Sequence, residues 1–79
     1  MFTAEVRISL KKGVADPEGA NTMKALNLLG FNVKDVRTVK LFEIDFECES
    51  EEKARKEVEE MCKKLLANPV IHKASIEIR

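Results

Sequence analysis

Apolar residues at every second position predict a β-strand at each end of the chain. Over residues 2–10 the alternating apolar residues are Phe2, Ala4, Val6, Ile8 and Leu10. Over residues 70–78 one side carries Val70, Ala74, Ile76 and Ile78. A period of two is typical of a strand with one buried and one exposed face. We therefore expect both strands to belong to a sheet with one covered face.

A first helix is predicted over about residues 17–29. Asp16 supplies an N-cap acceptor and Pro17 occupies the first helical position, where proline is well tolerated. Gly30 is suited to a left-handed C-cap, with Phe31 folding back on the last turn. The expected buried stripe consists of Met23, Leu26 and Leu29, flanked by Ala25 and Leu28.

A second helix is predicted over about residues 51–67. Ser50 is the expected N-cap, and Asn68-Pro69 ends the helix because proline disfavours helical geometry in the preceding residue. The expected buried stripe consists of Ala54, Val58, Met61, Cys62 and Leu65. Acidic residues four positions before basic ones indicate that the opposite face is solvated.

Residues 33–48 contain no Gly, Pro or Asn that would mark a reversal after residue 33. They predict one long bent strand or two strands divided by a turn near residues 38–40, and we favour the long strand. Phe42, Ile44 and Phe46 share one face. Val39 and Leu41 lie on the other face among acidic residues. This apolar patch indicates a subunit contact, although isolated exposed apolar residues are also common.

Together these elements predict one domain over residues 1–79, with an α+β fold. We expect a two-layer sandwich in which a three- to four-stranded sheet carries both helices on one face. The open face would then carry Thr3, Glu5, Arg7, Ser9, Val39, Leu41, Ser75 and Glu77. A chain of 79 residues buries a small core, so self-association is also expected.

Composition narrows the classes of function. With 14 basic and 14 acidic residues the net charge is zero, which disfavours nucleic acid and membrane surfaces as partners. The sequence contains neither a membrane-length apolar run nor a signal-peptide pattern, so we expect a cytoplasmic protein. Cys48 and Cys62 are 14 positions apart without a CxxC motif, and we interpret both as reduced structural thiols.

The sequence predicts no catalytic or metal site. His72 is the only histidine and lies on the core side of its strand, where a hydrogen-bonded structural ring is expected. Cys62 lies on a buried helix stripe, with nothing to activate its thiol. Lys11-Lys12-Gly13 could approach a phosphate but lacks a P-loop pattern. An interaction surface is the function that remains.

Three segments resemble a known family. They are LKKGVADPEG at 10–19, ALNLLGFNVKDVR at 25–37 and EMCKKLLANPVI at 60–71. In order and spacing they resemble the PurS family, the small subunits of phosphoribosylformylglycinamidine synthase. The resemblance extends over essentially the whole chain.

The resemblance implies a non-catalytic subunit of an enzyme of de novo purine biosynthesis. Such a subunit acts as a homodimer, with a dimer of dimers as a further option, and bridges a glutaminase subunit and a large synthetase subunit. It thereby supports ammonia transfer between them. The complex uses glutamine, ATP and Mg²⁺, none of which the resemblance assigns to this chain. The alternative hypothesis is a regulatory α+β domain that binds a small ligand as a dimer.

The candidate interface residues come partly from the resemblance. It implies contact or shape positions at the entry of the first helix and the exit of the second: Asp16, Pro17, Glu18, Gly19, Leu65, Leu66, Asn68 and Pro69. Arg37 and Lys40 match an Arg-x-Gly-Lys pattern in which Val39 here replaces the glycine. Val39 and Leu41 are added from the apolar patch described above.

Overall fold

The computed structural model describes all of residues 1–79. Its elements are β1 (Phe2–Leu10), α1 (Pro17–Leu28), β2 (Lys40–Phe46), α2 (Glu51–Met61), the π-helical turn η1 (Cys62–Leu66) and β3 (His72–Ile78). The strands form one antiparallel sheet in the order β2-β1-β3. The predicted α+β class and the three-stranded sheet are confirmed.

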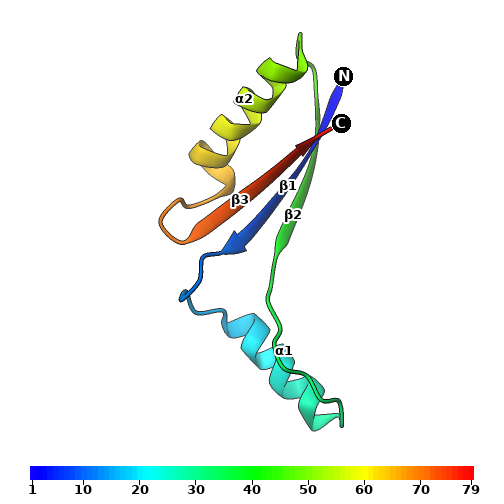
Figure 1. Cartoon of the computed structure of the whole chain (residues 1–79), viewed down its shortest axis with the longest axis vertical. Coiled ribbons are helices and arrows are strands. Elements are labelled where there is room, and N and C mark those ends of the chain that lie inside the picture. Colours follow the sequence, from blue (N-terminus) through cyan, green and yellow to red (C-terminus); the bar gives the residue numbers. More distant parts are fainter.

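The core lies between the sheet and α2, which cover each other (Figure 1). Strand register aligns Val6 with Phe42 on one side and Ile76 on the other. Because side chains alternate along a strand, the apolar rows of all three strands fall on the face that α2 covers. The buried cluster consists of Ala4, Val6, Ile8, Val58 and Cys62.

Helix α1 does not cover the sheet. It projects from the end of the sheet beside extended residues 31–39 (Figure 1), and we name residues 17–39 the arm. The prediction that both helices cover one sheet face is wrong for α1. Its expected buried stripe is also wrong in part, because Leu28 is 84% and Leu29 is 74% exposed.

Residues 33–48 form neither one long strand nor two strands divided by a turn. Only Lys40–Phe46 pair with β1, as β2, while residues 31–39 are extended and pair with no strand. Their backbone contacts go to α1: Val33 N–H donates to Asn27 Oδ1 at 2.8 Å, and Asn27 Nδ2 donates to the Val33 carbonyl at 3.3 Å. The extended segment is therefore held by the helix of the arm.

The helix caps follow the sequence prediction. Gly30, at φ 101°, follows the end of α1 in the left-handed region. Its N–H donates to Asn27 O at 3.1 Å, and Phe31 N–H donates to Leu26 O at 3.2 Å, which together define a Schellman motif. Ser50 Oγ accepts from Lys53 N–H at 3.2 Å and caps α2.

The second helix ends in a wider turn than predicted. Ala67 N–H donates to Cys62 O at 2.9 Å, five residues back, which defines the π-helical turn η1. The wider turn changes which leucine faces inward. Leu66 packs against the core, whereas Leu65 is 84% exposed, so its predicted place in the buried stripe is wrong.

The third strand begins later than predicted. Residues Asn68 to Ile71 form a turn, and β3 starts at His72. Val70, expected on the apolar side of the strand, lies in that turn and is exposed.

Candidate interaction surface

Asp16 joins the two parts of the arm. One carboxylate oxygen, Oδ1, accepts from Gly19 N–H at 3.0 Å and caps α1, as predicted. The other, Oδ2, accepts from Thr38 N–H at 2.8 Å, across 22 residues. These hydrogen bonds, that of Thr38 first and that of Gly19 second, lower the pKa of Asp16 below its ordinary value of 3.8.

Gly19 allows the extended segment to approach α1. It is the one buried residue of the helix, and a Cβ atom built on it would overlap the carbonyl oxygen of Val36 and crowd the Asp16 carboxylate. Only a glycine fits this close approach without displacement of the backbone. Together, Asp16 and Gly19 fix the base of the arm.

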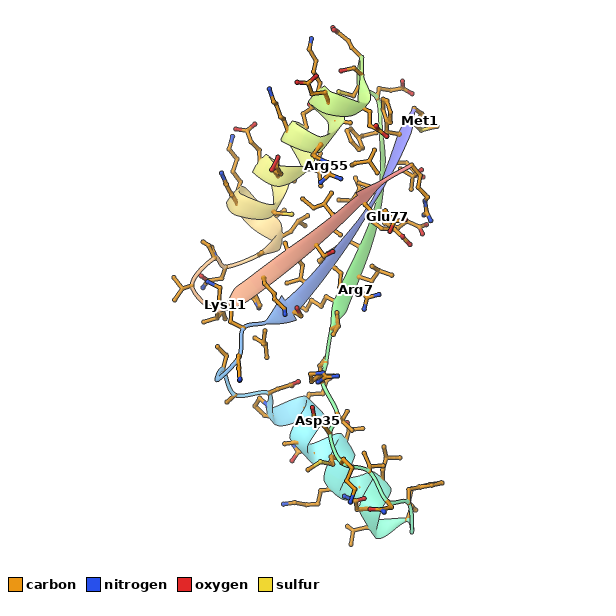
Figure 2. The ribbon with its side chains drawn as sticks, in the orientation of Figure 1. Met1, Arg7, Lys11, Asp35, Arg55 and Glu77 are labelled. Atoms are coloured by element: carbon orange, nitrogen blue, oxygen red, sulfur yellow. The ribbon has the colours of Figure 1, made fainter.

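The sheet face opposite α2 is open, and its side chains lie in rows across the strands. Glu5 lies between Glu43 of β2 and Glu77 of β3. Arg79 is 3.5 Å from both Glu5 and Glu43, which offsets part of the repulsion in this row. The next row contains Leu41, Arg7 and Ser75. Figure 2 shows Arg7 and Glu77 on the side of the sheet away from α2.

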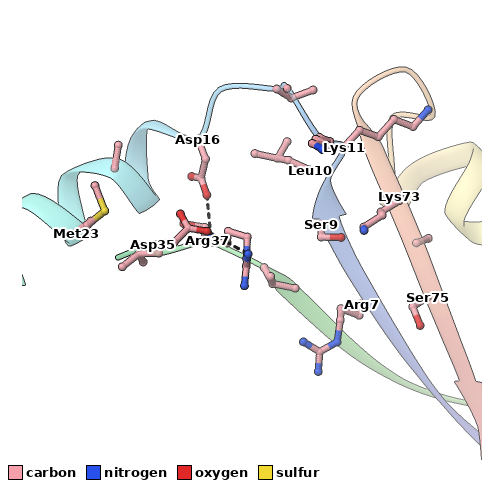
Figure 3. A pocket seen from close by; sticks show the side chains of 18 residues that line it. Arg7, Ser9, Leu10, Lys11, Asp16, Met23, Asp35, Arg37, Lys73 and Ser75 are labelled. Carbon is pink, nitrogen blue, oxygen red and sulfur yellow. Dashed lines mark hydrogen bonds and ion pairs between the residues drawn. The ribbon is translucent and has the colours of Figure 1, made fainter. Parts of the chain in front are cut away.

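A groove of about 940 Å³ lies where the open face meets the base of the arm (Figure 3). The sheet contributes Arg7, Ser9, Lys73 and Ser75. The arm contributes Ala20 and Met23 of α1 and residues 35–39, and the turn after β1 closes one end with Lys11, Lys12 and Gly13. The groove thus has both polar and apolar walls.

The turn between α2 and β3 is ordered by hydrogen bonds to Asn68 and His72. Asn68 N–H donates to His72 Nδ1 at 2.9 Å, and Asn68 Oδ1 accepts from Val70 N–H at 3.0 Å. Lys11 Nζ donates to the Pro69 carbonyl at 2.6 Å and connects this turn to the end of β1. The expected structural, hydrogen-bonded role of the half-buried His72 is confirmed.

No catalytic constellation accompanies these surfaces. No three His, Cys, Asp or Glu side chains lie close enough together to hold a metal ion. Burial raises the pKa of the Cys62 thiol, and the charge of Glu59 raises it further, which is opposite to the activation that a nucleophile needs. Neither helix has the length and apolar character required to cross a membrane.

The predicted interface residues fall into two groups in the structure. Around the base of the arm and the start of β2 lie Asp16, Pro17, Glu18, Arg37, Val39, Lys40 and Leu41. Asn68 and Pro69 lie in the turn before β3, and Lys11 connects that turn to the end of the groove. Val39 is 39% and Leu41 is 56% exposed, so this apolar patch is uncovered within the chain. The interface role of all nine residues stays a prediction.

Sequence reasoning did not predict the contact between Asp16 and Thr38, the row of three glutamates or the groove. The sequence did contain one signal for the contact between Asp16 and Thr38. Gly19 lies inside a helix, where glycine costs stability, so its presence indicates a close backbone approach. The glutamate row and the groove depend on strand register and on the direction of the arm, which no local pattern encodes.

The fold and its surfaces define a small α+β protein with a three-stranded sheet that is open on one face and with an exposed arm. The PurS family model, described as phosphoribosylformylglycinamidine (FGAM) synthase, matches residues 3–79. The chain therefore belongs to the PurS family, as its resemblance predicted.

Individual relatives agree with this assignment. The chain is 60% identical over 79 residues to phosphoribosylformylglycinamidine synthase subunit PurS of Methanocaldococcus jannaschii, covering 99% of this chain and 95% of the relative. It is 40% identical over 79 residues to the Bacillus subtilis subunit PurS, covering 99% and 93%.

Solved structures share the fold over nearly the whole length. The crystal structure of Methanocaldococcus jannaschii PurS superposes with a TM-score of 0.92 at 59% identity, covering 100% of this chain and 96% of that one. The structure of PurLQS from Thermotoga maritima contains a chain that superposes with a TM-score of 0.89 at 29% identity, covering 99% and 96%.

Proposed function

We propose that this chain is the small, non-catalytic subunit of FGAM synthase, in de novo purine biosynthesis in the cytoplasm. It acts as a homodimer that bridges the glutaminase and the large synthetase subunits and supports ammonia transfer between them. The structural observation that carries this proposal is the incomplete packing of the chain. Only 7 of its 79 residues are buried, and one sheet face and the outer half of α1 are uncovered.

The shape of the molecule supports the same proposal. Its radius of gyration is 16.0 Å and its extents are 51 × 24 × 15 Å. A compact domain of this length has a radius of gyration of about 12 Å. A chain that is extended in this way presents more surface for partners than a compact domain does. Membership of the PurS family and the PurLQS structure of a relative favour the other subunits of that enzyme as those partners.

Glutamine, ATP and Mg²⁺ are assigned to the larger subunits. In this chain no carboxylate or histidine cluster has the geometry of a metal site, and the thiol pKa of Cys62 is raised. We infer that the chemistry of the complex lies on its partners and that this chain supplies contact surfaces.

Reconstitution tests the bridging role. The chain is mixed with separately purified glutaminase and synthetase subunits, and glutamine-dependent product formation is measured with and without it. We expect little product without the chain and restoration when it is added in equal amount. Full activity of the two large subunits alone would contradict the proposal.

The dimer interface is tested by a pair of leucine variants. Leu41→Glu places a charge in the apolar patch of the open face, whereas Leu65→Glu makes the same change at an exposed leucine beside α2. Sedimentation equilibrium is expected to show a dimer for the parent and for Leu65→Glu, and a monomer for Leu41→Glu. A monomeric parent chain would contradict the homodimer.

A further inference from the structure

The groove at the base of the arm has a surplus of positive charge. Five cations and two carboxylates line it, in a chain whose net charge is zero. Both carboxylates already have donors: Asp16 accepts two backbone N–H groups, and Asp35 pairs with Arg37 at 3.1 Å. Five cations against two carboxylates leave the lining with a formal charge of +3.

Three of the five cations have no partner within the chain. Lys11 donates to the Pro69 carbonyl, and Arg37 is paired with Asp35. The side chains of Arg7, Lys12 and Lys73 form no hydrogen bond or ion pair. These three side chains are thus the cations of the groove that have no interaction within the chain.

Two of the unpaired cations form a block with two hydroxyl groups. Arg7 lies directly opposite Ser75, and Ser9 lies directly opposite Lys73. Neighbouring residues on one sheet face are about 5 to 8 Å apart at Cβ, so all four side chains can reach one anion. Figure 3 shows Arg7 and Ser9 on β1 and Lys73 and Ser75 on the neighbouring β3, at the sheet wall of the groove.

The turn that closes the groove adds further donors. Lys12 and Gly13 lie outside the helices and strands, and their N–H groups make no internal hydrogen bond. Gly13 has a φ of 89°, so the turn follows a path that a side chain would strain. The sequence indicated this Lys-Lys-Gly segment as a weak phosphate site. The structure places it beside the Arg7 and Lys73 block.

We propose that this groove binds the phosphate group of a small phosphorylated metabolite. Arg7 and Lys73 neutralise the phosphate, and Ser9, Ser75 and the turn at Lys12 donate hydrogen bonds to it. Arg presents a planar fork that suits phosphate oxygens, and charge-assisted hydrogen bonds are stronger than neutral ones. The apolar wall of Ala20, Met23 and Val36 receives the carbon skeleton of the metabolite.

The size of the groove favours a small molecule over an acidic segment of a protein. Its volume of about 940 Å³ falls within the range of small-ligand sites. The proposal is separate from the bridging role, and it requires that the dimer contact at Leu41 leave its row neighbours Arg7 and Ser75 accessible.

Titration of the ¹⁵N-labelled full chain with ribose 5-phosphate tests the proposal, with ribose and inorganic phosphate as comparison probes. We expect saturable amide shifts at Ser9, Lys12, Lys73 and Ser75, with a dissociation constant for ribose 5-phosphate below about 1 mM. Inorganic phosphate should bind at the same residues more weakly, ribose should not bind, and added salt should weaken both phosphates.

A matched pair of double variants assigns the site. Arg7→Gln with Lys73→Gln removes two charges from the groove, and Arg55→Gln with Lys63→Gln removes two from exposed positions in α2 and η1. The groove variant is expected to bind ribose 5-phosphate at least about tenfold more weakly, and the control variant equally well. Circular dichroism and sedimentation confirm that fold and assembly are unchanged in both.

Several outcomes would overturn the proposal. They are the absence of saturable shifts, equal binding of ribose and ribose 5-phosphate, and equal loss of affinity in the two double variants. Tighter binding of an oligoglutamate peptide than of ribose 5-phosphate would instead assign the groove to an acidic protein segment. Failure of the reconstitution assay described above would leave these binding results unaffected.

Discussion

The two ends of the molecule differ in how far the chain completes its own packing. Around α2 and the sheet, apolar residues from β1, α2 and η1 enclose a core in which Ala4, Val6 and Val58 have no exposed surface. In the arm, the only buried residue is Gly19, while Leu28 and Leu29 point into solvent. The arm is held by a few polar contacts: Asp16 to Thr38, and Asn27 to Val33.

This difference separates what the chain needs for folding from what it offers to partners. Burial of apolar surface is the dominant source of stability, so the sheet and α2 carry most of the stability of the isolated chain. The arm keeps its shape through caps and hydrogen bonds, and its apolar surface stays available. Mutations in the two regions should therefore have different consequences.

The largest effect is expected from truncation in the core. Val58→Ala removes two methyl groups from a fully buried site of α2 and should lower the free energy of unfolding by about 2 kcal/mol. Leu28→Ala removes more atoms but from an exposed site of the arm, and should change it by less than about 0.5 kcal/mol. Urea denaturation monitored by circular dichroism measures both.

The comparison depends on the state of assembly, so both variants are measured over a range of protein concentrations. A large loss of stability for Leu28→Ala that grows with concentration would show that a second copy covers the arm. A large loss that is independent of concentration would contradict the description of the arm as uncovered within one chain.

An effect of similar size but more local is expected from Gly19→Ala. Alanine in place of glycine normally stabilises an exposed helix interior by about 1 kcal/mol. Here the added methyl group would overlap the Val36 carbonyl, so we expect destabilisation of the arm by about 2 kcal/mol instead. Amide hydrogen exchange should become faster at Thr38 and Val33 and stay unchanged in β1. Slower exchange throughout the arm would contradict the close approach.

The π-helical turn predicts opposite behaviour for adjacent leucines. Leu66→Ala removes a half-buried side chain that contacts the core and should cost about 1 to 2 kcal/mol. Leu65→Ala changes an exposed side chain and should have an effect below about 0.5 kcal/mol. Urea denaturation of the two variants under identical conditions measures the loss in the free energy of unfolding for each. A larger effect for Leu65 would indicate a regular α-helix at this point.

The sequence predicted those elements whose signals are local. The period-two pattern of β1, the Asp16 and Ser50 caps and the Schellman turn at Gly30 each depend on a few adjacent residues, and each is present in the structure. The buried places of Val58 and Cys62 also followed from helical spacing. Local patterns were therefore sufficient for most of the sheet and α2.

The position of the arm could not be predicted from local patterns. The apolar stripe of α1 suggested burial against the sheet. An apolar helix face, however, does not indicate whether the surface that packs on it belongs to the same chain. Residues 33–39 contain no residue that marks an interruption of the predicted strand, yet they lie beside α1, held by the distant contacts at Asp16 and Gly19. The groove at the base of the arm could not be predicted for the same reason. Its basic residues can be read from the sequence, but the groove that they line forms only through the placement of the arm.

The smallest expected effect concerns pH and the base of the arm. The pKa of Asp16 is lowered by hydrogen bonds from Thr38 and Gly19. A carboxylate with a lowered folded pKa stabilises the fold above its unfolded pKa, and that contribution is lost as pH falls through the folded pKa. We therefore expect the Thr38 amide resonance to shift below pH 3.8, toward its position in a released arm, while the resonance of the buried Ile8 in β1 stays in place. Asp16→Asn should show the released position at neutral pH and no such titration, because the amide carries no charge. An unchanged Thr38 resonance in that variant would show that the hydrogen bond to Asp16 does not hold the arm.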